Sequence, residues 1–292
     1  MTEMKLDSIP SIEEFREFLN DVTVTDWHHA LVNNALEVVK GFPEAEGAIL
    51  KGSLGRGRGD VFSDIDFVIL HDGEPSDSAG ISRRFMNELD RIGEMIHFFT
   101  STAFHEDKII YFRPFVKFEL NVRTCRQAEG DWSSSLGEIL YDRRGRLKEV
   151  VAAASEVKFS VDNVMDTIRD RAIQIPTFCY ITAGFIVRGE NATALNALNW
   201  IRNDMLRLSG WILGLWDEGP RRAEERFPEE VLDFYMQSTA KTVEEIWDGI
   251  KVLLAWYENW LIPRFEELSL THALVQVEPM KQALRILKIK PS

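Results

Sequence analysis

The pattern of hydrophobic and polar residues changes at about residue 155. Before that point, short apolar or alternating runs bounded by turn residues predict strands at 47–50, 65–70, 94–99, 108–112, 115–122 and 138–141. Helical spacing predicts helices at 12–19, 26–39 and 82–92, with Ser11 and Thr25 as N-caps of the first two. We therefore expect the first part of the chain to hold a mixed β-sheet flanked by helices.

From about residue 160 onward, long apolar stripes at helical spacing replace the short runs. A first helix is expected after Asp162 as its cap, and Pro176 should kink or interrupt that helix. Further helices are predicted at 192–213, 229–239, 243–260 and 279–287. The pattern predicts an α+β chain, with a mixed domain over residues 1–155 and an all-α helical bundle over residues 156–292.

Composition and charge narrow the classes of function. A chain of 292 residues with 45% hydrophobic content is large enough for two domains with packed cores. The net charge of -13 argues against a general binder of nucleic-acid backbones. Cys125 and Cys179 form neither a disulfide framework nor a zinc spacing. With no apolar signal core and no membrane-length apolar run, we expect a cytoplasmic protein without membrane or nucleic-acid partners.

The candidate chemistry is concentrated between residues 51 and 70. Gly52 and Ser53 close a short strand, a glycine-rich loop follows, and Asp64 and Asp66 open the next strand. Strand alternation places both aspartates on one face, about 6.6 Å apart along the backbone. Two carboxylates beside a loop rich in backbone N–H groups suit a hard divalent cation and the phosphates that it carries. The loop has neither the ending of a P-loop nor the spacing of the dinucleotide-binding fingerprint.

A third carboxylate is expected from the run 115–122. Its apolar residues alternate with Lys117, Glu119 and Asn121, which share the other face. Should this strand lie beside that of Asp66, Glu119 would join the two aspartates. Three converging carboxylates repel one another unless a cation neutralises them, and Mg²⁺ prefers such oxygen ligands. The alternative for Glu119 is an ordinary solvated carboxylate on an exposed strand.

These residues resemble the motif of the DNA polymerase β-like nucleotidyltransferase superfamily, and the antibiotic-modifying lincosamide and aminoglycoside nucleotidyltransferases within it. Gly52 and Ser53 match the family's Gly-Ser pair, and Asp64 and Asp66 match its paired metal ligands. Glu119 stands for the third carboxylate, which is Asp in the family pattern. The helical second half resembles the bundle that follows the catalytic domain in that branch. The resemblance implies a catalytic nucleotidyltransferase domain and a second domain for acceptor binding or dimerisation.

The resemblance also implies an activity. A nucleoside monophosphate, AMP from ATP, would be moved to a hydroxyl of a small molecule such as an aminoglycoside or lincosamide antibiotic, with release of pyrophosphate. Asp64 and Asp66 would hold Mg²⁺, with two ions expected, and Glu119 would act as metal ligand, general base or both. Gly52 and Ser53 would hold the outer phosphates.

Further contacts to the nucleotide are expected from the loop and from the strand of Glu119. Arg56, Ser63 and Lys117 are the candidates, and an exposed loop cation is the alternative for Arg56. In the second domain, Glu190 and Asp204 are candidates for contact with a cationic acceptor, an expectation that rests on the acidic charge balance alone.

Two other functions remain open on the sequence alone. A regulatory or antitoxin-like module could keep this fold while acting on, or binding, a partner protein. Transfer to a protein side chain or to an RNA end is a further alternative, and the net acidity speaks against RNA. The aromatic-rich helical half makes a homodimer plausible.

Overall fold

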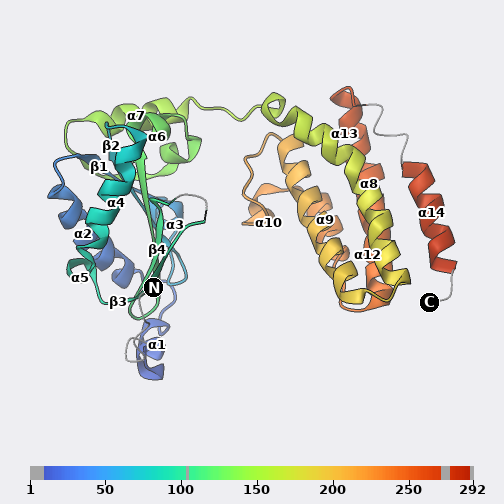
Figure 1. Ribbon diagram of the computed structural model, residues 1–292, viewed down its shortest axis with the longest axis horizontal. Coiled ribbons are helices and arrows are strands. Elements are labelled where there is room, and N and C mark those ends of the chain that lie inside the picture. Colours follow the sequence, from blue (N-terminus) through green and yellow to red (C-terminus); the bar gives the residue numbers. More distant parts are fainter. Residues whose placement is uncertain (1–9, 103–104, 271–276, 290–292) are drawn as a thin grey trace. The chain divides into compact units, whose positions relative to one another are not determined.

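The computed structural model describes residues 10–102, 105–270 and 277–289. The chain divides into two compact units, residues 1–158 and 159–292, each with its own hydrophobic core (Figure 1). The expected α+β class is confirmed, because the first unit mixes strands with helices and the second is helical. Among the helices in the described part of the chain, none has the length and apolar character needed to cross a membrane.

The first unit is built on a six-stranded sheet with the order β3-β4-β5-β2-β1-β6. Its strands are β1 (Ala45–Lys51), β2 (Ile65–His71), β3 (Met95–Thr100), β4 (Lys108–Phe112), β5 (Val116–Thr124) and β6 (Glu138–Asp142). Each lies within a residue or two of a predicted strand. The central strands β2 and β5 pair in parallel, whereas β1–β2, β1–β6, β3–β4 and β4–β5 are antiparallel. The two strands with the candidate carboxylates are therefore neighbours.

Helices and short turns surround this sheet (Figure 1). They are α1 (Ile12–Phe18), α2 (Asp26–Lys40), α3 (Gly52–Gly55), η2 (Pro75–Asp77), α4 (Ser78–Met86), α5 (Leu89–Ile92), α6 (Cys125–Glu129), η3 (Trp132–Leu136) and α7 (Arg146–Ser155). Ser11 caps α1 in a capping box with Glu14, as predicted, whereas Thr25 makes no side-chain cap bond at α2. The single helix predicted over 82–92 is wrong, because the backbone leaves helical geometry at Glu88.

The two faces of the sheet are covered differently. One face carries Phe67 and Phe118, which are fully buried in the core formed with α2, α4 and α5. On the other face, Val68 and Leu70 pack against α6 and α7. Because strand residues alternate between faces, Asp66 shares the second face with Val68. The candidate carboxylates therefore lie on the same face as α6 and α7. They are at the start of β2, whereas α6 and α7 cover Val68 and Leu70 further along the strand.

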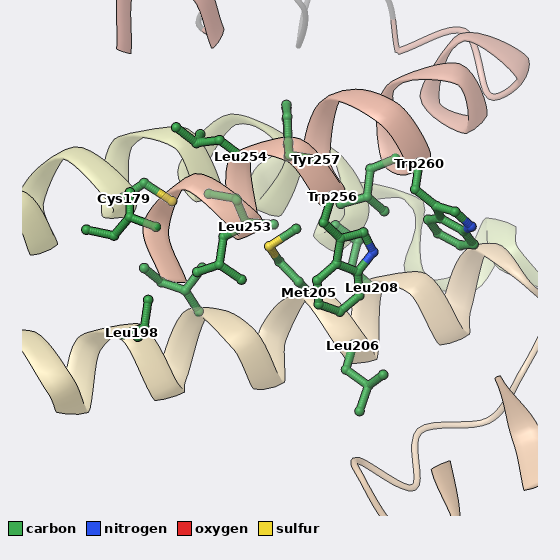
Figure 2. Close-up of a cluster of buried hydrophobic side chains, with 14 of the residues drawn as sticks. Cys179, Leu198, Met205, Leu206, Leu208, Leu253, Leu254, Trp256, Tyr257 and Trp260 are labelled. Atoms are coloured by element: carbon green, nitrogen blue, oxygen red, sulfur yellow. The ribbon is translucent and has the colours of Figure 1, made fainter. Parts of the chain in front are cut away.

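The second unit is a bundle of helices. They are η4 (Val161–Val164), α8 (Met165–Val187), α9 (Asn191–Ile212), α10 (Ala223–Arg226), α11 (Glu229–Gln237), α12 (Val243–Trp256), the π-helix η5 (Tyr257–Leu261), α13 (Ile262–Glu267) and α14 (Val277–Ile289). Figure 2 shows Met205 of α9 beside Trp256 at the end of α12, within the apolar cluster that joins these helices. The core is large and apolar, as the stripes in the sequence indicated.

The second unit differs from the prediction in local details. Ser160, rather than Asp162, supplies the capping side chain, and it serves the short η4 ahead of α8. α8 continues through Pro176, so the expected interruption is absent, whereas the expected kink stays a prediction. The proline removes one backbone donor, but its ring is buried among the residues that hold α8 in the bundle. The helix predicted over 243–260 changes into a π-helix at Tyr257.

Candidate active site

Three polar residues form a row across neighbouring strands at the centre of the first unit. Asp66 on β2 is the register partner of Glu119 on β5 and of Lys51 on β1. Register partners project from the same face of a sheet, and adjacent strands are about 4.8 Å apart. The expectation that Glu119 would come from the strand beside Asp66 is therefore met by the pairing of β2 with β5.

Lys117 links the other candidate aspartate to Glu119. Its Nζ lies 2.8 Å from Oδ2 of Asp64, just before β2, and 2.5 Å from Oε1 of Glu119. All three side chains are about one-quarter to one-third exposed, at 27%, 26% and 30%. Burial of the ammonium acts to lower its pKa, but the two carboxylates outweigh burial and raise the pKa of Lys117 above its ordinary value. Lys117 is therefore a permanent cation between two acidic side chains.

The turn after β1 brings the glycine-rich loop against Asp66. Gly52 has a φ of +68°, in the left-handed region, and a Cβ at this position would overlap Oδ2 of Asp66. The hydroxyl of Ser53 donates to Oγ of Ser63 at 2.8 Å, and this bond ties the start of the loop to its end. Ser63 directly precedes Asp64, so the loop and the carboxylates form one connected structure.

Arg56 folds back onto the same loop. Its Nε donates to the carbonyl oxygen of Gly52 at 3.0 Å, while the side chain stays exposed. This position is compatible with both expectations for Arg56, a phosphate contact and an exposed loop cation. Its assignment as a nucleotide contact stays a prediction.

Sequence reasoning missed the part that His28 plays behind the loop. This residue of α2 is fully buried, and its Nε2 lies 3.1 Å from the carbonyl oxygen of Ser63. A carbonyl oxygen accepts, so Nε2 carries the proton, and burial lowers the pKa of His28. The sequence indicated the burial of His28, because His28 lies three and four residues before Leu31 and Val32 and so shares their apolar face of α2. His28 supports the turn that presents Asp64.

Lys51 is a second residue that sequence reasoning missed. Its side chain lies on the face of Asp66, but Nζ is 2.8 Å from Oδ2 of Asp131, which caps η3. Lys51 therefore anchors η3 to the end of β1, next to Gly52. Such a contact joins residues 80 positions apart, and local periodicity contains no sign of it.

The acidic candidates of the second unit are arranged differently from the expectation. Asp204 is 5% exposed, and its Oδ2 lies 3.2 Å from Nε of Arg171. It is part of the interior of the bundle, so the prediction that Asp204 meets a cationic acceptor is wrong. Glu190 is exposed, and it pairs with Arg188 at 2.7 Å.

The side chains of the first unit have the chemistry that Mg²⁺ requires, since Asp64, Asp66 and Glu119 are oxygen donors gathered beside one loop. Gly52 leaves the carboxylate of Asp66 room that any other residue would fill. Over residues 10–102, 105–270 and 277–289, however, no group of three or more His, Cys, Asp or Glu side chains is placed to hold a metal ion. The Lys117 ammonium stands between Asp64 and Glu119. Their assignment as metal ligands stays a prediction.

Comparisons with known proteins place nucleotidyltransferases among the solved structures that the chain resembles. No protein-family model matches the sequence, and no curated protein matches it. An aminoglycoside 6-adenyltransferase from Bacillus subtilis is 12% identical, with a TM-score of 0.38 over 90% of this chain and 97% of that chain. A nucleotidyltransferase-like protein from Exiguobacterium sibiricum 255-15 is 12% identical, with a TM-score of 0.40 over 83% of this chain and 78% of that chain.

A Cid1 poly(U) polymerase with Mg and 3'-dATP bound is 20% identical, with a TM-score of 0.27 over 57% of this chain and 50% of that chain. At such identities and TM-scores, the likeness carries no weight for activity or substrate. The function must be argued from the side chains themselves.

Proposed function

We propose that the protein transfers a nucleoside monophosphate, AMP from ATP, to a hydroxyl group of a small molecule and releases pyrophosphate. The observation that carries the proposal is the pairing of Asp66 with Glu119 across β2 and β5, beside the Gly52 turn, with Lys117 joining Glu119 to Asp64. Lys117 neutralises Asp64 and Glu119 where no metal ion is bound, and a divalent cation would take over that role.

Asp64, Asp66 and Glu119 would hold Mg²⁺ as carboxylate ligands. When bound, the ion would neutralise the triphosphate and the charge that develops on it during transfer. Lys117, which contacts Asp64 in the absence of the ion, would pair with a phosphate oxygen of the bound nucleotide. Ser53 and the backbone amides that follow it would hold the outer phosphates.

The transfer itself is an in-line displacement at the α-phosphorus. The acceptor hydroxyl oxygen forms a bond to this phosphorus, while the bond from the phosphorus to the bridging oxygen of pyrophosphate breaks. Glu119 lies at the edge of the acidic group, next to β4, and we assign to it the proton of the attacking hydroxyl. Glu119 would thus act together with Asp64 and Asp66.

The test is transfer of label from ATP that carries it on the α-phosphate. The full chain is incubated with this ATP, Mg²⁺ and a panel of aminoglycosides, lincosamides and alcohols that carry an aromatic ring, and the products are separated. Label should move to an acceptor with release of pyrophosphate. Asp64→Asn and Asp66→Asn should each lower the rate by roughly 10² to 10⁴, at about 1.4 kcal/mol per tenfold. Asp166→Asn is the control, because this aspartate is 94% exposed and lies in the second unit.

Two outcomes would contradict the proposal. Unchanged turnover in both Asp64→Asn and Asp66→Asn would show that these carboxylates have no part in the chemistry. Binding of ATP without transfer to any acceptor would favour the alternative, a nucleotide-binding module that acts on a partner protein.

A further inference from the structure

The face of the sheet that carries the carboxylates continues into a surface of aromatic side chains. Lys117 on β5 is the register partner of Tyr111 on β4, and Tyr111 is the partner of His97 on β3. Because register partners project from one face, Tyr111 and His97 lie on the same face as Lys117.

The next row of partners leads from the carboxylates to a second ring. Glu119 is paired with Ile109 on β4, and Ile109 is paired with Phe99 on β3. Tyr111 and Ile109 therefore lie one strand away from the acidic group, about 4.8 Å across the sheet, and Phe99 lies two strands away.

The rings contact one another in a continuous chain. The centroids of Phe99 and Tyr111 are 6.3 Å apart, and those of Tyr111 and Phe115 are 5.4 Å apart. His97 lies 6.4 Å from Phe99, and Phe15 of α1 lies 5.8 Å from Phe115. We call His97, Phe99, Tyr111 and Phe115 the aromatic row. These spacings are those of interacting aromatic pairs.

Exposure distinguishes the aromatic row from the rings that hold the fold together. Phe99 is 43% exposed and Phe115 is 50% exposed, whereas Phe112 and Phe118 on the opposite face are fully buried. The core of the first unit is complete without the aromatic row. Exposed rings that form a contiguous apolar surface are typical of a binding site rather than of a folding core.

We propose that the aromatic row binds the acceptor of the transfer reaction, and that this acceptor carries an aromatic or flat apolar ring close to its reactive hydroxyl. The inference rests on the proposed function for the role of the acidic group. Tyr111 lies opposite Lys117, and Ile109 lies opposite Glu119. A ring that covers Tyr111 and Ile109 would therefore border Glu119, so that a hydroxyl attached near the ring reaches the carboxylate that accepts its proton.

The chemistry of the surface selects the class of acceptor. Phe99, Ile109 and Phe115 offer apolar area and no charge, and Glu119, which lies opposite Ile109, already pairs with Lys117. A polycationic aminoglycoside would find little to pair with there. A ring-bearing alcohol would gain stacking and apolar contact with the row.

The test compares two probes that share the same sugar hydroxyls. Binding of 4-nitrophenyl β-D-glucopyranoside and methyl β-D-glucopyranoside to the full chain is measured by saturation-transfer NMR, without ATP or Mg²⁺. The nitrophenyl probe should bind and the methyl probe should not. Phe99→Ala and Tyr111→Ala should each raise the Kd of the nitrophenyl probe about threefold or more, since one aromatic pair contributes roughly 0.5–1.5 kcal/mol.

Control variants distinguish the loss of an aromatic contact from general damage to the fold. Phe99→Leu keeps an apolar side chain without the ring and should also weaken binding. Met236→Ala removes an apolar side chain that is 65% exposed in the second unit, and it should leave the Kd unchanged. Competition by AMP tests whether the row binds the nucleobase instead, because an adenine ring on the aromatic row would displace the nitrophenyl probe.

The inference is overturned if the nitrophenyl probe fails to bind, or binds equally to the wild type, Phe99→Ala and Tyr111→Ala. Displacement by AMP, with a raised Kd for ATP in Phe99→Ala, would also overturn it and assign the row to the nucleobase. These readouts need no turnover. Failure of the transferase proposal is reported separately by the α-labelled ATP assay with Asp64→Asn.

Discussion

Gly52 lies directly against the carboxylate of Asp66. The backbone at Gly52 has a φ of +68°, and a Cβ there would overlap Oδ2 of that carboxylate. Gly57 in the same loop has a φ of +66°, but a Cβ at Gly57 would meet nothing within 4 Å. The two glycines have the same backbone conformation but different surroundings. Substitution of Gly57 therefore measures the cost of the backbone conformation alone, and substitution of Gly52 adds the steric overlap with Asp66.

Gly52→Ala should therefore impair both folding and the site. The left-handed φ costs about 1–2 kcal/mol for a residue with a side chain, and the overlap must push Asp66 aside. We expect a free energy of unfolding lower by about 2–3 kcal/mol and a transfer rate lower by about 10² or more. Gly57→Ala, the matched control, should lose about 1–2 kcal/mol and keep its activity. Equal activity in the two variants would show that Gly52 does not position Asp66.

Because His28 is buried, we expect the free energy of unfolding to fall on mild acidification. Burial lowers its pKa in the folded protein, so the unfolded chain takes up a proton at a higher pH than the folded chain does. Stability is therefore full above the ordinary histidine pKa of about 6.5 and falls as the pH drops below it. Urea unfolding between about pH 7.5 and 5.5 should show this fall, and His28→Gln should reduce it.

A second buried histidine provides the comparison for that experiment. His71 is 1% exposed, its Nε2 lies 2.9 Å from Oγ of Ser78, and burial lowers its pKa as well. His71→Gln should remove its own share of the pH dependence. Only His28→Gln should also disturb the turn at Ser63 and slow the transfer reaction. A pH slope unchanged in both variants would contradict the argument.

Local periodicity was enough to predict the strands and the face that each residue occupies. The alternation of buried and half-buried residues along β5 is complete, so Lys117 and Glu119 could be assigned to one face from the sequence. The strand β4 has the predicted bounds, because turns precede Lys108 and follow Phe112. A pattern with period two has one physical cause, which is that one face of a strand is buried.

Contacts between distant segments could not be predicted in that way. The hydrogen bond from His28 to Ser63 spans 35 residues, and nothing in either segment specifies it. The burial of Asp204 depends on Arg171, which lies on a different helix. The aromatic row needs the order β3-β4-β5, which sets Phe99 near Tyr111. Strand order and helix packing are tertiary properties, so residues such as these acquire their roles only in the folded chain.

Lys117→Met should make the acidic group more dependent on divalent cations. Without the ammonium, Asp64 and Glu119 repel each other, and we expect a loss of about 1 kcal/mol in the absence of Mg²⁺. Mg²⁺ should raise the Tm of the variant more than that of the wild type, because in the wild type the ion must displace Lys117. Thermal unfolding with and without Mg²⁺ measures the difference.

The matched control for this experiment is Lys40→Met. Lys40 pairs with Glu37 at 2.6 Å, but the two side chains are 42% and 67% exposed on α2. Its loss should change the free energy of unfolding by less than about 0.5 kcal/mol, with no effect of Mg²⁺. An equal response to Mg²⁺ in the wild type and Lys117→Met would show that the ion does not bind between Asp64 and Glu119.

Arg202 should determine much of the stability of the second unit. It is 8% exposed, and it donates to the carbonyl oxygen of Tyr235 at 2.7 Å, to Oγ of Ser238 at 2.9 Å and to Oγ1 of Thr239 at 2.9 Å. These acceptors are neutral, and burial lowers the pKa of the guanidinium. Lysine cannot make the same planar set of bonds, so Arg202→Lys should lower the free energy of unfolding by about 2–4 kcal/mol in denaturant titrations. Arg188→Lys, at a side chain that is 56% exposed, should cost less than about 0.5 kcal/mol. Equal losses in the two variants would mean that the chain from α9 to α11 is held by apolar packing alone, and that the buried guanidinium only fills space.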